Sequence, residues 1–338
     1  MTLRRAYYHC AACGSGQIPY DANSGLGEGQ LSSRLAAVVS LLAVQASFDQ
    51  AGQLVHELTG IRVDDNTIQR TAERAGQVLL DRNDQAVQKA LESRQPPSAG
   101  VQPQRLYVSA DGTTAPTMEG WREVKCGAVY WEDPVQGHQC RYVGRIEGCE
   151  DFGRRLWHLA CECGLRQAAE VVVLGDGAPW IWNQAQLRLS RAVQILDWYH
   201  ASEHVWLCAN GLYGEGTPDA KTWAESKLKV LYEHGGQAML EALQRSGRAR
   251  GRPPEPLEAL TGYVTSNVKR MDYPAYRAAG LHIGSGPVES ACKRLVNGRL
   301  KGPGMKWKVC GADAILALRI TWFNGQWQEF WKTKPLAA

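Results

Sequence analysis

The acidic residue Asp176 stands where a carboxylate could serve in catalysis. It follows the apolar run Val171–Leu174 and lies between Gly175 and Gly177. A short, continuously apolar run predicts a strand buried on both faces, and the two glycines allow a sharp turn after it. A carboxylate at the C-terminal end of such a strand points into the crevice where α/β sheets hold ligands. The same Gly-Asp-Gly sequence is also typical of a plain tight turn, so its role depends on partner carboxylates.

Two further acids could act together with Asp176. Asp111 ends a short strand predicted over residues 105–110, and Glu289 lies in the first turn of a helix that begins near Pro287. Two Mg²⁺ ions about 3.5–4 Å apart need several oxygen ligands, and they would activate a hydroxyl and stabilise a leaving oxygen in phosphoryl transfer. Each acid also has a structural interpretation, Asp111 and Asp176 as turn formers and Glu289 as a residue favoured by the helix dipole.

The strands and helices predicted around these acids indicate an α/β domain in the C-terminal part of the chain. Its first part, residues 105–200, carries strands over 105–110, 123–131, 139–146, 171–174 and 191–196, and a helix that Asp151 caps and that ends near Cys163. The order β-β-β-α-β-α-β predicts a mixed sheet with helices, the layout of an RNase H-like fold. Residues 201–282 predict a helical insertion. Residues 283–331 return to the core with the helix of Glu289, a Gly- and Lys-rich loop and a final amphipathic helix.

Residues 26–95 predict a helical domain, which a linker at 96–104 joins to the sheet. Two of its helices meet through a turn at Gly60, and Asp64, Asp65 or Asn66 would cap the second of them. This is the outline of a helix-turn-helix, whose second helix reads DNA in the major groove. The groove-facing side chains would then be Thr67, Gln69 and Arg70. A small helical bundle that only packs fits the same pattern.

The first 25 residues contain the sequence Cys10-Ala-Ala-Cys13-Gly, a spacing that presents two thiolates to zinc. A structural zinc site needs four ligands, and no second C-x-x-C lies nearby. His9 is the nearest further candidate. The segment therefore predicts a partial zinc-ribbon-like unit, in which Cys10 and Cys13 are ligands of Zn²⁺, or else a plain turn.

Composition indicates a cytoplasmic protein without a membrane span. No run of about 18 apolar residues and no signal sequence is present, and the ten cysteines are scattered as reduced thiols would be. The net charge of +4 is mild, but cations gather after Glu289, where a polyanion such as DNA would suit them. The cations that we expect to contact DNA there are Lys293, Arg294, Arg299, Lys301 and Lys306. A solvated surface is the alternative.

Several motifs together resemble the DDE transposases of bacterial insertion sequences, and most of all the ISKra-type group, which is related to the Mutator-like enzymes. The resemblance covers residues 7–331. The motifs that carry it are Asp111-Gly, Gly175-Asp-Gly-Ala with Trp180-Ile-Trp182, Asp197-Trp-Tyr-His-Ala-Ser-Glu-His204, Gly284-Ser-Gly-Pro-Val-Glu-Ser290, and Arg299-Leu-Lys301 with Gly304-Met-Lys-Trp307.

The resemblance implies an RNase H-like core whose acidic triad falls on Asp111, Asp176 and Glu289, with Mg²⁺ or Mn²⁺ as cofactor. It also implies that Asp197 and His200 match a D-x-x-H motif of the Mutator-like enzymes. Such a protein binds the ends of its element as a homo-oligomer on double-stranded DNA at the nucleoid, cleaves a phosphodiester and joins the freed 3′-hydroxyl to target DNA. Relatives carry a fuller cysteine segment, and this chain departs from them there.

His200 and His204 stand four residues apart on one predicted helix face, a spacing that could hold a metal ion. We expect instead that His200 acts beside the metal ligands. Two other functions remain open for the whole chain. One is a DNA-binding derivative of a transposase that has lost catalysis, and the other is a nuclease with the same core that cannot join strands.

Overall fold

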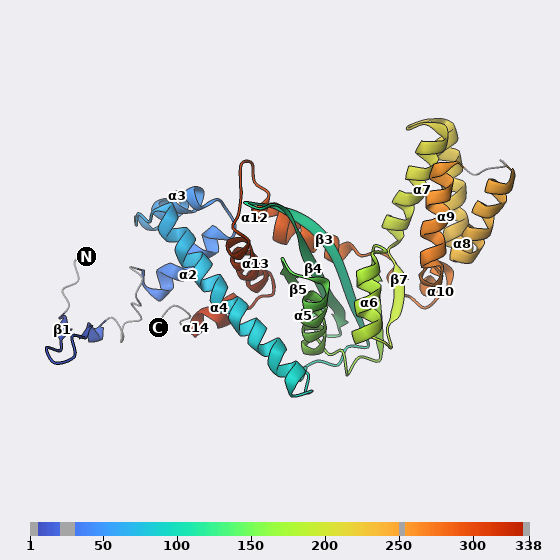
Figure 1. Cartoon of the computed structure of the whole chain (residues 1–338). Helices are drawn as coiled ribbons and strands as arrows, with labels where there is room; N and C mark the ends of the chain where they lie inside the picture. Colours follow the sequence, from blue (N-terminus) through green and yellow to red (C-terminus); the bar gives the residue numbers. More distant parts are fainter. Residues whose placement is uncertain (1–5, 21–30, 250–253, 334–338) are drawn as a thin grey trace.

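A five-stranded mixed sheet forms the centre of the structure (Figure 1). The computed structural model describes residues 6–20, 31–249 and 254–333, and the boundary expected near residue 25 lies outside them. The strands are β3 (Arg105–Thr117), β4 (Gly120–Asp133), β5 (Gly137–Arg145), β6 (Glu170–Gly175) and β7 (Val193–Leu196), in the order β5-β4-β3-β6-β7. β3, β4 and β5 are antiparallel, whereas β6 is parallel to β3 and to β7. The predicted mixed α/β sheet is therefore confirmed.

The strand β3 is longer than the sequence predicts, and this corrects the setting of Asp111. β3 pairs with β6 only as far as Ser109, but its pairing with β4 continues to Thr117. Asp111 therefore lies inside a strand and not at its end. The Gly-Thr-Thr sequence after Asp111 reads as a turn locally, but β4 supplies the hydrogen bonds that keep this segment extended.

The two faces of the sheet are covered by different helices. Gly127 lies against Leu156 of α5 (Cys149–Glu162), and a Cβ on Gly144 would meet the side chains of Leu316 and Ile320 in α13 (Val309–Phe323). Because Gly144 pairs with Cys126, the neighbour of Gly127, these contacts fall on opposite faces. The helix α6 (Pro179–Arg188) packs beside α5. Gly148 is the N-cap residue of α5, and no side chain caps this helix, so the predicted cap by Asp151 is wrong.

Three helices precede the sheet, as predicted. They are α2 (Ser33–Ala43), α3 (Phe48–Thr59) and α4 (Asp65–Glu92), and all three pack against one another. Ser32 caps α2, Gly60 ends α3 with a φ of 71°, and Asp64 caps α4 by accepting a hydrogen bond from the Thr67 backbone N–H. A small hairpin of β1 (Tyr8–His9) and β2 (Gly16–Gln17) lies nearer the N-terminus.

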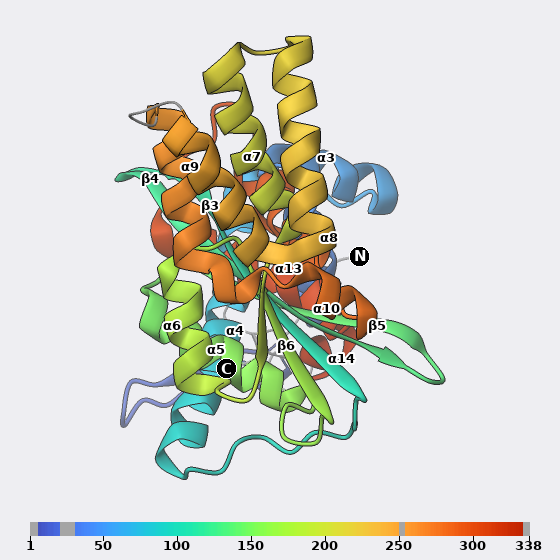
Figure 2. The ribbon, with the colours of Figure 1, turned by 90° about the vertical axis from the view of Figure 1, so that its right-hand side faces the viewer.

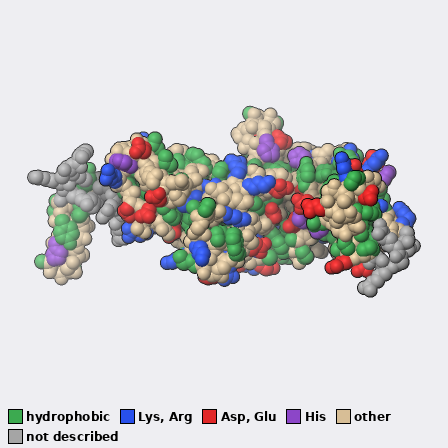
Figure 3. All heavy atoms as spheres, turned by 90° about the horizontal axis from the view of Figure 1, so that it is seen from above, with side chains coloured by type: hydrophobic (Ala, Val, Ile, Leu, Met, Phe, Trp, Pro, Cys, Tyr) green, Lys and Arg blue, Asp and Glu red, His purple; other side chains and the backbone are tan. Residues whose placement is uncertain are grey.

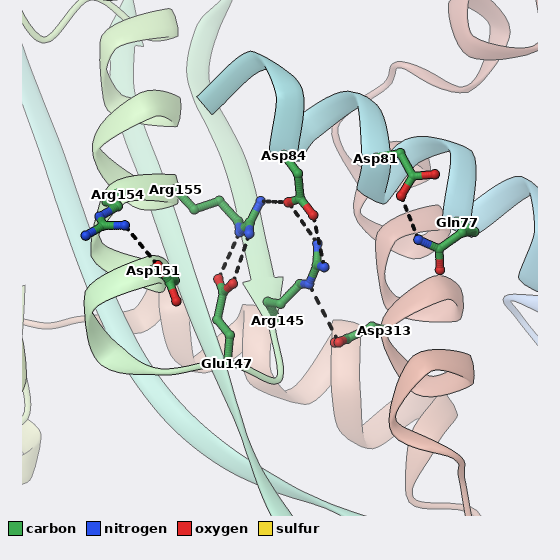
Figure 4. A network of polar contacts seen from close by, with 9 residues as sticks. All are labelled: Gln77, Asp81, Asp84, Arg145, Glu147, Asp151, Arg154, Arg155 and Asp313. Atoms are coloured by element: carbon green, nitrogen blue, oxygen red, sulfur yellow. Dashed lines mark hydrogen bonds and ion pairs between the residues drawn. The ribbon is translucent and has the colours of Figure 1, made fainter. Parts of the chain in front are cut away.

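The helix α4 also packs along α13, and charged groups fix its far end to the sheet (Figure 4). Asp84 of α4 accepts hydrogen bonds from Arg155 of α5, at 2.8 Å, and from Arg145 of β5, at 3.2 Å. Arg155 also pairs with Glu147 at 2.8 Å, and Arg145 lies 3.6 Å from Asp313 of α13. One network thus joins α4, α5, α13 and the sheet.

The predicted helical insertion follows β7 and rises from the sheet as one group of helices (Figure 2). It contains α7 (Trp198–Tyr213), α8 (Pro218–Ala249, kinked at Gly235), α9 (Glu255–Asn267), the 3₁₀ turn η1 (Val268–Arg270) and α10 (Tyr273–Ala278). The chain then returns through α11 (Gly286–Ala291), the π-helical η2 (Cys292–Asn297) and α12 (Gly298–Leu300). Of the helices described, none is long and apolar enough to span a membrane.

The predicted final helix is in fact two helices. α13 ends at Phe323 and α14 (Trp327–Lys332) follows a turn in which Gly325 has a φ of 71°. α13 is also not amphipathic, because it is buried between α4 and the sheet and is apolar on nearly every side.

Candidate active site

Asp111 and Asp176 lie at the same level on neighbouring parallel strands. Ser109 of β3 is in register with Leu174 of β6, and each acid follows its partner by two residues. Since side chains two residues apart share one face of a strand, the two carboxylates extend from the same face and edge of the sheet. The negative charge of Asp176 acts directly on Asp111. The structure therefore brings these two predicted acids together.

Burial raises the pKa of the Asp111 carboxyl, and the charge of Asp176 raises it further. The backbone N–H of Gly112, at 2.7 Å from Oδ1, favours the charged form, and so does the nearby His200. The Asp176 carboxylate accepts a hydrogen bond from the Ala178 backbone N–H at 2.8 Å, which fixes the turn into α6. Each acid thus keeps one oxygen that no backbone group occupies.

Glu289 lies in α11, which packs over β3 and β4. One helical turn further on, the Sγ of Cys292 lies 3.5 Å from the Asp111 Oδ2, so this helix approaches the acid pair. The Glu289 carboxylate pairs with Lys293 at 3.6 Å. Within the described part of the chain, no three His, Cys, Asp or Glu side chains are grouped closely enough to hold a metal ion.

Asp197 follows the neighbouring strand β7 at the same level as Asp176, because Leu196 of β7 is in register with Gly175 of β6. The residue is only 2% exposed, however, and both carboxylate oxygens are occupied. One accepts the His200 backbone N–H at 2.7 Å and caps α7, and the other accepts the Ser285 backbone N–H. Asp197 therefore fixes the start of α7 to the segment that leads into α11, which is a positioning role.

His200 and His204 lie beside the acid pair on α7, with ring centroids 5.1 Å apart. His200 also lies 3.5 Å from Glu203. His204 stacks on Tyr263 at 3.8 Å, and the hydroxyl of Tyr263 donates a hydrogen bond to the Asp176 carbonyl at 3.1 Å. Burial lowers the pKa of His204, which favours the neutral ring. Sequence reasoning missed Tyr263, because α9 carries no motif that would single it out.

Two thiols close to Asp111 were also missed. Cys126 is the β4 partner of Asp111, and Cys292 hydrogen-bonds to both. Both thiols are buried. Nothing in their spacing indicates that they meet at an acidic residue, because that contact depends on how α11 and η2 pack on the sheet.

The basic residues after Glu289 divide into two groups. Lys301 donates a hydrogen bond to the Thr113 Oγ1 at 2.9 Å, and Thr113 is on the same face of β3 as Asp111. Lys293 and Lys306 are exposed. Arg294 is exposed as well, with its guanidinium 4.4 Å from the centre of the Phe323 ring. Four of the five predicted DNA contacts are therefore accessible to a ligand at least in part.

Arg299 is the exception, and its predicted contact with DNA is wrong. Its side chain is buried, donates to the Ala43 carbonyl at 2.7 Å and packs over the rings of Phe48 and Trp307. Burial and the charge of Arg319 lower the pKa of Arg299 to about 10. A residue enclosed in this way holds the C-terminal end of α2 and cannot reach a ligand.

The predicted groove-facing residues lie on the first turns of α4. Arg70 is exposed, and its guanidinium donates to the Thr67 Oγ1 at 3.3 Å. Gln69 is half-buried and donates to Glu73 at 2.8 Å. The helix-turn-helix outline is therefore present as α3, the turn at Gly60 and α4. The rest of α4 packs on α13, as the bundle alternative expects.

Cys10 and Cys13 lie exposed at the turn of the β1–β2 hairpin. The Cys13 Sγ is 3.0 Å from the Ser15 hydroxyl, and hydrogen bonds to Ser15 and Cys10 lower the pKa of Cys13 to about 7. These are two thiols without a third or fourth ligand in the described residues, so they do not complete a tetrahedral zinc site.

Comparison with known proteins found no family model that matches the chain. The chain is 24% identical, over 331 residues, to a protein of Streptococcus gallolyticus named "UPF0236 protein in vanSb 3'region". The similarity covers 93% of this chain and 69% of that protein, so it includes both the N-terminal helices and the sheet.

Proposed function

We propose that this protein is a metal-dependent DNA transposase in which Asp111, Asp176 and Glu289 hold the metal ions. The observation that carries the proposal is the position of Asp111 and Asp176, level with each other on adjacent parallel strands and each with one oxygen that no backbone N–H occupies. Charge repulsion between two such acids is a cost that a purely structural site avoids, and it is typical of sites that bind cations.

The sheet supports the same proposal. Its order, with three antiparallel strands followed by two parallel ones and a helical insertion before the last acidic helix, is the arrangement that the DDE resemblance implies. We infer that the domain is RNase H-like. The relative from Streptococcus gallolyticus extends over nearly the whole chain, which is consistent with N-terminal helices and sheet acting as one protein.

The side chains fit magnesium better than a dedicated all-protein metal cage. Mg²⁺ is bound by hard oxygen ligands, and usually by one or two carboxylates together with waters and substrate phosphate oxygens. Asp111 and Asp176 provide two such carboxylates, and Glu289 lies on α11, one helical turn before the Cys292 that contacts Asp111. Bound there, Mg²⁺ or Mn²⁺ would lower the pKa of an attacking hydroxyl and neutralise the leaving oxygen.

Other residues of the site would then bind and orient the DNA. Lys301 is hydrogen-bonded to Thr113, two residues after Asp111 on β3, and can hold a phosphate next to the acids. Lys293 and Lys306 extend the positive charge. Tyr263 fixes the backbone at Asp176. We infer that Arg70 and its neighbours on α4 contact the element ends, and that two copies bind together, because joining both ends of an element needs two sites.

The test is cleavage and joining of an end duplex, defined as DNA that the purified protein enriches from genomic fragments. We expect the wild type with Mg²⁺ to give both cleaved and joined products. Asp111→Asn, Asp176→Asn and Glu289→Gln should each reduce both by roughly 10³-fold or more, because ligands of one site act as a unit. Asp219→Asn, an exposed acid of α8, is the control and should retain activity.

Binding to the end duplex should survive in all three variants, because removal of an acid lowers repulsion of the DNA. Thermal melting of each variant checks that it is folded. Metal-dependent cleavage by a folded Asp176→Asn protein would contradict the proposal. Cleavage without joining by the wild type would instead indicate a nuclease, and binding without cleavage would indicate a DNA-binding derivative.

A further inference from the structure

The tip of the β3–β4 hairpin carries two large apolar side chains that are mostly exposed. Met118 and Trp121 are each 66% exposed. They lie in and beside the turn that joins the two longest strands, at the end of the ribbon that leaves the sheet after Asp111. Met118 and Trp121 together expose apolar surface at one tip, and a contiguous exposed apolar patch is typical of a contact with a partner.

Hydrogen bonds fix the backbone of this turn. The Thr117 hydroxyl donates to the Gly120 carbonyl and accepts the Glu119 backbone N–H at 3.2 Å. Gly120 has a φ of 100°, a conformation that favours glycine. The backbone N–H of Met118 also donates to the Trp307 carbonyl at 2.9 Å. A tip that is fixed in this way can insert into a partner without losing much conformational entropy.

Positive charge flanks the tip. Trp307 is buried against Phe48 and pairs with β3 through the Pro116 carbonyl, and this anchors the segment around it. Lys306 and Lys308 alternate with the buried Trp307 and are therefore both exposed. Viewed from above, Lys and Arg side chains gather over the middle of the molecule (Figure 3). At the tip itself, Arg122 and Glu119 pair at 2.6 Å, so the surplus charge comes from the lysines.

The distance from the acids to the tip follows from the strand. Six residues of β3 separate Asp111 from Thr117, which at about 3.3 Å per residue is about 20 Å. Base pairs of a duplex rise by about 3.4 Å, so a duplex lying along β3 would place about six base pairs between the acids and the tip. Lys301, which is hydrogen-bonded to Thr113, lies between the acids and the tip.

We propose that the β3–β4 tip is a DNA wedge: Trp121 and Met118 insert between bases about six base pairs from the scissile phosphate, while Lys306 and Lys308 hold the adjacent backbone. This rests on the proposed function. The partner is DNA because apolar side chains flanked by lysines on a rigid tip are the combination that unstacks a base step and neutralises its phosphates. A second copy of this chain offers no reason for the two flanking lysines.

The experiment uses the full-length protein and end duplexes that carry the fluorescent base 2-aminopurine at single positions, from three to nine base pairs from the cleavage point. With Ca²⁺, binding of the wild type should raise the fluorescence at about the sixth position, because the base loses its stacking. Trp121→Ala with Met118→Ala should abolish this rise and weaken binding by about 5- to 150-fold, the contribution of one stacked base.

Val135→Ala is the matched control, because Val135 is 92% exposed at the tip of the neighbouring β4–β5 hairpin. It should keep both the fluorescence rise and the affinity. A wild type that binds and cleaves without unstacking any base would refute the wedge and leave the proposed function intact. So would a tip variant that binds DNA normally but loses self-association in sedimentation, since the tip would then contact a second copy. A wild type that does not bind or cleave DNA refutes both proposals.

Discussion

The carboxylates of Asp111 and Asp176 lie on adjacent strands and repel each other. The Asp111 carboxylate is also partly shielded from water. Burial is the main cause of the raised pKa of Asp111, and the charge of Asp176 is the next cause that raises it. A raised carboxyl pKa means that the folded protein binds the proton more tightly than the unfolded chain does. The charged acid therefore destabilises the fold at neutral pH, and a bound cation would relieve that cost.

We predict that Asp111→Asn melts at a higher temperature than the wild type at neutral pH without divalent metal. Stability contributed by this group falls as pH rises from the unfolded pKa through the raised folded pKa, so the difference should vanish in acid. Mg²⁺ should stabilise the wild type more than the variant, because a ligand stabilises only the state that binds it. Thermal melting across a pH series, with and without Mg²⁺, measures all three.

Asp133 provides a comparison of opposite sign. The backbone N–H groups of Gln136 and Val135 lower its pKa, so its charged form stabilises the β4–β5 turn above the unfolded pKa and loses this effect in acid. Asp133→Asn should therefore melt lower than the wild type at neutral pH. If Asp111→Asn behaves in the same way as Asp133→Asn, the acid pair is not under electrostatic strain.

At the scale of single elements, two buried arginines hold the C-terminal end of α2. Arg299 donates to the Ala43 carbonyl, and Arg319 of α13 donates to the Val44 and Leu295 carbonyls. The last carbonyls of a helix have no partner inside it, and a cation there also suits the helix dipole. These side chains therefore join α2 to η2 and α13, next to the loop that carries the exposed lysines.

We predict opposite effects for Arg299→Met and Lys306→Met. Arg299→Met should lower the free energy of unfolding by about 2–3 kcal/mol, because it removes a charged hydrogen bond and leaves a buried carbonyl unpaired. Lys306→Met should leave stability unchanged but reduce the slope of log affinity against log salt by about one contact. Urea unfolding and DNA titrations over a salt series measure the two effects. A changed salt slope in a folded Arg299→Met protein would instead indicate that Arg299 does contact DNA.

At the scale of the whole molecule, the packing of α4 on α13 joins the N-terminal helices to the sheet. The buried residues of both regions form one continuous core. Gly76 allows this close approach, because a Cβ there would lie 2.2 Å from the Ala314 carbonyl oxygen. The predicted separate domains at 26–95 and 105–200 thus share an interior, and the linker at 96–104 does not leave them independent of each other.

We predict that Gly76→Ala forces α4 away from α13 and lowers the free energy of unfolding by about 1–3 kcal/mol, the usual cost of overpacking. The wild type should unfold in one transition, whereas the variant should show the N-terminal helices unfolding earlier. Tryptophan fluorescence and far-ultraviolet circular dichroism in urea follow the two parts. Gly262→Ala, in an exposed position of α9 with open space around it, should instead stabilise by about 0.5–1 kcal/mol. Equal effects of the two substitutions would show that α4 is not tightly packed.

Local patterns were sufficient to predict most elements. The apolar run before Asp176 and the helical spacing of residues 31–92 each record the face that a segment buries, so these elements appear as expected. Boundaries were less reliable where partners decide them. The continuation of β3 past Asp111 depends on pairing with β4, and the break between α13 and α14 depends on the turn at Gly325.

The sequence by itself determined the order of the elements and the choice of Asp111 and Asp176 as candidate acids, because apolar runs and turn residues are local patterns. The level of the two acids on the sheet comes from the register of β3 with β6, which pairs distant segments. Only the tertiary structure decided which charged residues are accessible. Arg299 and Lys301 are two residues apart and look alike in sequence, yet one is enclosed by aromatic rings and the other reaches β3 beside Asp111. The contact of Cys292 with Asp111 and that of Tyr263 with Asp176 likewise join distant segments, and no local pattern encodes a distance in space.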